Sequence, residues 1–280
     1  MSGSFSPRWS RSNHSHEKLG PQEGQNTAKT STVLASPFQS FCQIVTPLHF
    51  QTTYQYPLLV WLHSAGASEL QIEQILPHIS SRNYVGVGVR ATYATDVQGS
   101  GFDWQSSQNG VRKACQNIFD AIEMTSRRHS IHPDRIILAG LGSGATMACR
   151  VAMQHPNAFA GVIRMSGRLE TAGCGLGKFN QLRQRRLPML WQQAMDGVDD
   201  DSAQLRRDIT TAQWLQAQVE IRQYPGNDVV NTAALKDIDR WCFDKIVTPS
   251  PATDSSTAAD TVNIELIQGS ELKMVEFSAN

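Results

Sequence analysis

The sequence predicts an α/β fold with a mainly parallel sheet and helices on both faces. Segments typical of strands alternate with segments typical of helices, an order that favours parallel strands joined by helical crossovers. Residues 58–62 (LLVWL) form a continuous apolar run, as expected of a strand that is buried on both faces. Residues 135–139 form a second such strand, which leads directly into a glycine-rich turn and a helix.

The first half of this pattern follows from periodicity. A strand is expected at residues 41–47, before the apolar run described above. Residues 69–82 carry apolar side chains three and four positions apart, which predicts an amphipathic helix. Residues 84–89 predict another buried strand, and a long polar loop leads from it to an amphipathic helix at 107–128.

The second half repeats the alternation. Each strand is a short apolar run, and each helix has apolar positions at helical spacing. The expected strands are residues 159–165, 187–191 and 219–224, and the expected helices are residues 145–154, 201–216 and 233–246.

The two ends of the chain differ in composition from this core. Residues 1–36 are rich in Ser, Asn, Gln and Gly without periodicity, which predicts a disordered N-terminal tail. Residues 37–247 are then the α/β domain, and 248–280 a polar C-terminal tail. Within that tail, 262–267 and 273–277 either pair as a short β-hairpin or are loosely ordered.

Composition narrows the functional classes. Lys and Arg together number 25, as do Asp and Glu, so nothing predicts an electrostatic nucleic-acid partner. There is no apolar signal segment and no apolar run near the length of a membrane span. The five cysteines are odd in number and lack a C-x-x-C pair, which favours reduced thiols over a disulfide framework or a zinc site. We therefore expect a cytoplasmic protein without a metal or cofactor.

The glycine-rich turn carries the most information. It reads Gly-Leu-Gly-Ser-Gly, whereas the nucleophile elbow of α/β-hydrolases reads G-x-S-x-G between a strand and a helix. Gly140 and Gly144 match the flanking glycines, so Gly142 stands at the nucleophile position. Ser143 is one position later, and its use would place Leu141 where strand and helix backbones pass closely.

The bare motif has another interpretation, as a tight turn that binds phosphate. The dinucleotide-binding pattern G-x-G-x-x-G would need a third glycine where Ala145 stands. The turn also lies in the middle of the chain, whereas in dinucleotide-binding folds this pattern occurs at the first strand–helix turn.

The histidines test the hydrolase interpretation independently. In α/β-hydrolases the catalytic residues follow the order nucleophile, acid, histidine. No histidine follows His155, so a triad in this order has no base, and serine without a nearby base is a weak nucleophile. The eight histidines are His14, His16, His49, His63, His78, His129, His132 and His155.

Ordered landmarks over residues 55–247 resemble the phospholipase/carboxylesterase (acyl-protein-thioesterase-like) branch of the α/β-hydrolases. This resemblance implies an α/β-hydrolase fold. The family's oxyanion loop reads H-G-x-G, and here the sequence is His63-Ser64-Ala65-Gly66. The other landmarks are residues 56–63, 134–140, 159–167, 187–190 and 224–226.

The catalytic positions implied by the resemblance depart from the family pattern. The serine position is Gly142, the acid falls near Asp196, and the histidine position is Asp228. A carboxylate at 228 cannot act as the imidazole relay of a serine mechanism. Asp196 and Asp228 without a third ligand make a weak case for a metal site.

The sequence thus predicts a pseudo-hydrolase that binds a small apolar or acyl ligand, or another protein, around His63, Ser64, Gly66 and Ser143. His63 either lines a vestigial pocket at the family's catalytic site or only anchors its loop by hydrogen bonding. The alternative is a residual serine ester hydrolase of the carboxylesterase or thioesterase type, which uses Ser143 with a non-standard base such as Asp228 or Asp196. A third interpretation is a structural or regulatory partner that acts through its tails.

Overall fold

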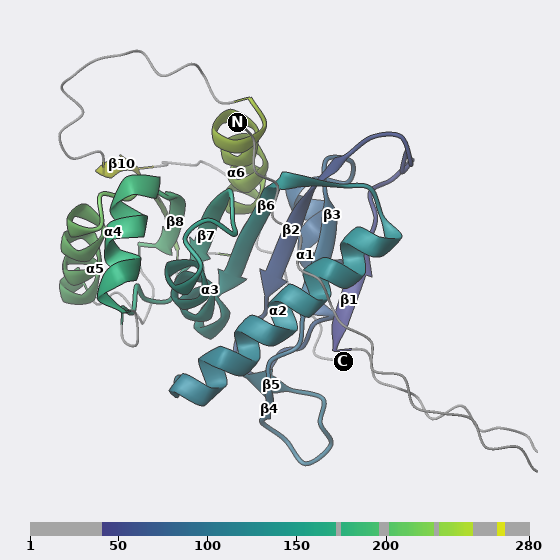
Figure 1. Ribbon diagram of the computed structural model, residues 1–280, viewed down its shortest axis with the longest axis horizontal. Coiled ribbons are helices and arrows are strands. Elements are labelled where there is room, and N and C mark those ends of the chain that lie inside the picture. The colour runs from purple at the N-terminus through teal and green to yellow at the C-terminus, as the bar shows by residue number, and fades with distance from the viewer. Residues whose placement is uncertain (1–40, 172–174, 196–201, 227–229, 249–261, 267–280) are drawn as a thin grey trace, which may run out of the picture. The chain divides into compact units, whose positions relative to one another are not determined.

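The computed structural model describes residues 41–171, 175–195, 202–226, 230–248 and 262–266. They form a central sheet with helices on both faces (Figure 1). The sheet strands are β1 (Cys42–Val45), β2 (Tyr56–Leu62), β3 (Val85–Val89), β6 (Ile131–Leu141), β7 (Gly161–Met165), β8 (Pro188–Ala194), β9 (Gln218–Tyr224) and β10 (Val262–Leu266). A separate two-stranded hairpin consists of β4 (Tyr93–Ala94) and β5 (Phe102–Asp103).

The helices alternate with these strands along the chain. They are α1 (Gln71–Ile79), α2 (Gln108–Arg128), α3 (Ser143–Gln154), α4 (Leu176–Arg185), α5 (Ser202–Trp214), α6 (Thr232–Cys242) and the π-helix η1 (Phe243–Val247). None of the described helices is both long and apolar enough to cross a membrane.

The sheet has the order β1-β3-β2-β6-β7-β8-β9-β10. Only β1 runs antiparallel to its neighbour, and every other described pair of sheet strands is parallel. The predicted α/β fold with a mainly parallel, doubly covered sheet is therefore confirmed.

Two apolar layers explain the continuous run in β2. Leu58 and Leu62 belong to a layer shared with α2, α3 and α5, whereas Leu59 and Trp61 belong to one shared with α1 and α6. Successive side chains of a strand point to opposite faces, so a strand covered on both sides is apolar at every position. All seven residues of β2 are buried.

Some elements differ from expectation. The glycine-containing loop and basic segment before β8 contain helix α4, because Phe179 and Leu182, three positions apart, give it an apolar face against the core. The long loop before α2 contains the β4–β5 hairpin. β10 pairs in parallel with β9, and residues 273–277, its expected hairpin partner, lie outside the described residues, as do residues 1–36.

A buried ion pair connects β7 to α5. Arg164 is fully buried, its guanidinium lies 4.0 Å from the centroid of the Trp191 ring, and it pairs with Asp208. The Asp208 carboxylate also accepts hydrogen bonds from the Leu169 N–H at 3.0 Å and from Gln204 Nε2 at 2.7 Å. A charge removed from water this completely is tolerated only while it is paired.

We expect Asp208→Ala to lower the free energy of unfolding by about 3–5 kcal/mol, because it leaves the Arg164 charge buried without its partner. Glu123→Ala is the control, since it breaks an exposed pair with Arg127 on α2 and should cost less than about 1 kcal/mol. Denaturant unfolding of both variants measures the difference. Equal costs would show that the buried pair does not stabilise the fold.

Candidate functional site

The turn between β6 and α3 lies at the carboxyl end of a central strand. Gly142 has φ 57° and ψ −117°, in the left-handed half of backbone space that strains residues with a side chain. Its N–H donates to the Met165 carbonyl at 2.9 Å, and its carbonyl accepts from the Thr146 N–H at 3.1 Å. These hydrogen bonds join the turn to both β7 and α3.

The glycines on either side are required for a different reason, which is space. A Cβ atom on Gly144 would lie 2.2 Å from the Leu62 carbonyl oxygen, and one on Gly140 would lie 2.6 Å from the backbone of Gly144. A Cβ on Gly142 would meet nothing nearer than Ser64 Cβ at 4.0 Å. The turn therefore has room for a side chain at Gly142 and none at its flanking glycines.

Ser143 is the first residue of α3, and its hydroxyl is engaged. Ser143 Oγ donates to Asp103 Oδ1 at 2.7 Å, and the same oxygen accepts the Trp104 N–H at 2.7 Å. Ser143 and Asp103 are both half-buried. The carboxylate beside Ser143 is thus Asp103 of the β4–β5 hairpin, whereas Asp196 and Asp228 lie outside the described residues.

His63 follows β2 and is fully buried. Its Nε2 accepts the Ala91 N–H at 3.0 Å, so the ring proton resides on Nδ1, which donates to the Ser64 carbonyl at 2.8 Å. Trp104 Nε1 donates to the His63 carbonyl at 2.8 Å, and the two rings lie 5.3 Å apart. Burial lowers the pKa of His63 and favours the neutral ring. Both ring nitrogens of His63 are hydrogen-bonded to backbone groups, so neither is free to act as a base beside the turn.

The rest of this loop is also fixed by hydrogen bonds. Gln71 Nε2 donates to Ser64 Oγ at 3.1 Å, and Gln71 Oε1 accepts from Trp61 Nε1 at 2.9 Å. Gly66, at φ 76°, donates its N–H to the Phe102 carbonyl at 2.9 Å. His63, Ser64 and Gly66 therefore belong to one ordered loop beside the β6–α3 turn, and Ser64 is the residue that faces Gly142.

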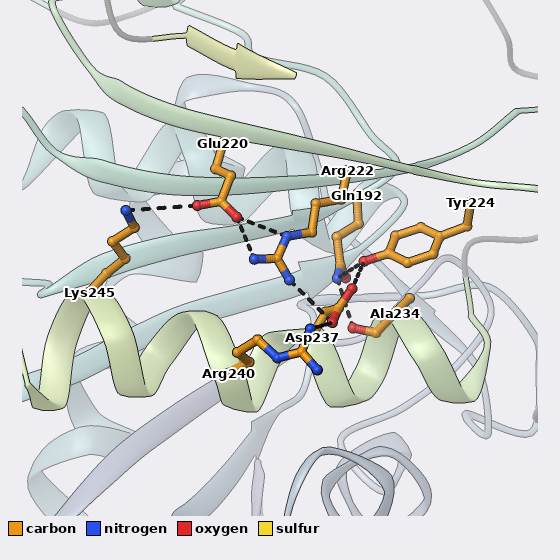
Figure 2. A network of polar contacts seen from close by, with 8 residues as sticks. All are labelled: Gln192, Glu220, Arg222, Tyr224, Ala234, Asp237, Arg240 and Lys245. Carbon is orange, nitrogen blue, oxygen red and sulfur yellow. Dashed lines mark hydrogen bonds and ion pairs between the residues drawn. The ribbon is translucent and has the colours of Figure 1, made fainter. Parts of the chain in front are cut away.

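A polar network between β8, β9 and α6 was missed by sequence reasoning (Figure 2). The Tyr224 hydroxyl donates to Asp237 at 2.9 Å and accepts from Gln192 Nε2 at 2.9 Å. Arg222 pairs with both Glu220 and Asp237. The alternation of polar residues at 220, 222 and 224 was the available signal, because these positions share one face of β9.

Two members of this network, Gln192 and Tyr224, come four positions before Asp196 and Asp228 respectively, where the resemblance places the acid and the histidine. Gln192 also donates to the Ala234 carbonyl at 2.7 Å, which joins β8 to the start of α6. Burial raises the pKa of Tyr224, and the neighbouring Asp237 carboxylate raises it further, so the phenol stays protonated. The network consequently holds α6 against the sheet and offers no nucleophile.

Other reactive groups are buried or isolated. Burial raises the pKa of the Cys149 thiol to about 12, which keeps it protonated near neutral pH. Cys42, Cys115 and Cys242 are likewise buried and form no disulfide among the described residues, and Cys174 lies outside those residues. Within the described ranges, no three His, Cys, Asp or Glu side chains gather as metal ligands would.

The strand–turn–helix and the loop after β2 define the class of this protein as an α/β-hydrolase fold. A model of the phospholipase/carboxylesterase family matches residues 61–227, which is more than half of the chain. The chain therefore belongs to the phospholipase/carboxylesterase family, and the resemblance described above is confirmed.

Solved structures agree on the fold. SOBER1 of Arabidopsis thaliana is 18% identical, with a TM-score of 0.54 over 67% of this chain and 97% of its own. A Bacillus cereus carboxylesterase is 14% identical, with a TM-score of 0.57 over 72% of this chain and 92% of its own. No curated protein matches the sequence. At these identities the likeness establishes a shared fold.

Gly144→Ala should destabilise the protein by on the order of 3 kcal/mol or more, because the new Cβ would overlap backbone atoms that cannot move aside. Gly142→Ala should cost only about 1–2 kcal/mol, since it meets backbone strain but open space. Thermal and denaturant unfolding of both variants tests this order. A milder effect at Gly144 than at Gly142 would mean that the turn is packed differently.

Proposed function

We propose that this protein is a pseudo-hydrolase, an α/β-hydrolase-fold member of its family that does not turn over esters by the serine mechanism. One observation carries the proposal, the glycine at the strained turn between β6 and α3. Gly142 has the positive φ and the open space that suit an elbow nucleophile, but it has no hydroxyl. We therefore assign Gly142 to the vacated nucleophile position.

The absence of a suitable base supports the same proposal. No histidine occurs after residue 155, and the family position for it is assigned to Asp228, as the acid position is to Asp196. His63 is the histidine beside the turn, and both of its ring nitrogens are engaged with backbone groups. A hydroxyl added at residue 142 would still lack a general base.

The proposed role is binding in the region that the family uses for catalysis. Ser143 is the first residue of α3, so its N–H belongs to the first turn of the helix. The N–H groups of a first turn have no hydrogen-bond partners within the helix and attract negative charge. The ordered loop of His63, Ser64 and Gly66 lies beside it, next to the space above Gly142. We infer a small apolar or acyl ligand, or a protein partner, as what this region binds. We place the protein in the cytoplasm, because its described cysteines are buried and form no disulfide.

The second candidate is residual ester hydrolysis by Ser143. The observation that favours it is the 2.7 Å hydrogen bond from Ser143 Oγ to Asp103, which supplies a base other than Asp196 or Asp228. A carboxylate is a weak base near neutral pH, so it activates a serine hydroxyl poorly. Ser143 also lies one position beyond the turn, on the helix. We therefore rank this candidate second.

Fluorophosphonate labelling of the full chain, read by intact mass beside a short-chain ester assay, separates the two candidates. We expect no adduct and no turnover above buffer, because Gly142 supplies no nucleophile and both ring nitrogens of His63 beside it are engaged. A stoichiometric adduct on Ser143 that disappears in Asp103→Asn would overturn the pseudo-hydrolase proposal and support the second candidate.

Restoring the missing groups tests the assigned positions. Gly142→Ser alone should add little ester hydrolysis, whereas Gly142→Ser with Asp228→His should raise the rate about 100-fold or more over the single variant, the usual gain from a general base. Adding Ser143→Ala to the double variant is the control and should leave this gained rate unchanged. An inert double variant beside a parent that hydrolyses esters would show that the positions are assigned wrongly.

A further inference from the structure

The structure contains a pocket at the opposite end of the sheet from the β6–α3 turn. It has a volume of about 410 Å³ and is lined at the start of β2 by Tyr56 and before β3 by Tyr84. Because β2 runs parallel to β6, which ends at Leu141 beside the turn, the pocket lies about one strand length, roughly 20 Å, from Gly142. It is therefore separate from the site proposed above.

Aromatic side chains make up much of the pocket wall. Tyr56 and Tyr84 are buried at its base, with 6% and 2% of their surface exposed. Tyr54 and Phe243 stand at its mouth with 46% and 55% exposed, and Tyr54 packs edge-on against Tyr56 at 4.7 Å. Two large rings left open to water beside a buried aromatic base form a surface on which a flat apolar group can stack.

The pocket is also lined by an arginine and a histidine whose side chains have no partner among the described residues. The Arg82 guanidinium and the His49 imidazole line it, and neither has a hydrogen bond or ion pair to any other described residue. The nearby Asp239 carboxylate is already held by Asn83, whose Nδ2 donates to both of its oxygens at 3.0 and 3.2 Å. Arg82 is therefore a cation in the pocket wall whose five N–H donors are not occupied by any described residue.

Two irregularities of the backbone meet at this pocket. Phe243 and Val247, which line it, are the first and last residues of the π-helix η1. His49 has φ 59°, and the preceding Leu48 N–H donates to the Ser81 carbonyl at 2.8 Å. π-helical turns and left-handed residues other than glycine are costly and occur frequently at functional sites.

We propose that this pocket binds a small aromatic carboxylate. The ring of the ligand stacks between Tyr54 and Phe243, and its carboxylate is bound by the planar guanidinium of Arg82. A guanidinium can donate two parallel N–H bonds to a carboxylate, a geometry that a point charge does not provide. The binding is independent of hydrolysis and of the β6–α3 turn.

Isothermal titration calorimetry of the full chain with 2-naphthoate tests the proposal. We expect saturable 1:1 binding that weakens at least fivefold in Arg82→Gln and in Phe243→Ser. Both residues are exposed, so these variants should fold, and their thermal unfolding checks this. Arg206→Gln is the matched control, because Arg206 is an exposed arginine on α5 and should leave the affinity unchanged.

Two further arms identify what is recognised. The neutral analogue naphthalen-2-ylmethanol should bind at least fivefold more weakly than 2-naphthoate, and Gly142→Ser should bind 2-naphthoate as the parent does. No saturable binding of 2-naphthoate overturns the proposal. So does binding that is lost equally in Arg82→Gln and Arg206→Gln, or binding that is unaffected by both.

Discussion

The close approach of α3 to the end of β2 is the constraint on which the central part of the structure depends. Because Gly144 has no side chain, its backbone can lie against the carbonyl of Leu62, and α3 can begin directly after β6. This contact sets the turn at Gly142 and places the loop that begins at His63 beside it. The arrangement requires glycine at 140 and 144 because a Cβ there would overlap backbone atoms. This requirement does not depend on whether residue 142 carries a nucleophile.

The polar interior stabilises the elements around this turn. Arg164 and Asp208 join α5 to β7 on one side of the sheet, and the network of Gln192, Tyr224 and Asp237 joins α6 to β8 and β9 (Figure 2). Each buried charge has an opposite charge as its partner, which is the condition under which burial is tolerated. These groups hold the helices of an α/β-hydrolase fold against its sheet.

The two proposed sites use opposite edges of one sheet. The carboxyl edge, where ligands of open α/β sheets usually bind, carries the glycine turn, and Ser143 there is paired with Asp103. The amino edge carries an aromatic pocket with Arg82 in its wall. Function depends on the sites that a fold carries, so a binding site can lie at either edge of the sheet.

The sequence by itself determined the fold class, the glycine pattern of the turn and the absence of a histidine after residue 155. Periodicity and turn chemistry are local properties, and the order of residues can be read directly along the chain. The sequence did not determine α4, where the apolar contacts of Phe179 and Leu182 outweigh the glycine at 177, nor the parallel pairing of β10 with β9. Only the tertiary structure brought Asp103 to Ser143, forty positions away, and closed the pocket from segments near Tyr54, Arg82 and Phe243. Contacts between distant segments depend on how the layers pack, and no pattern within a single segment records that.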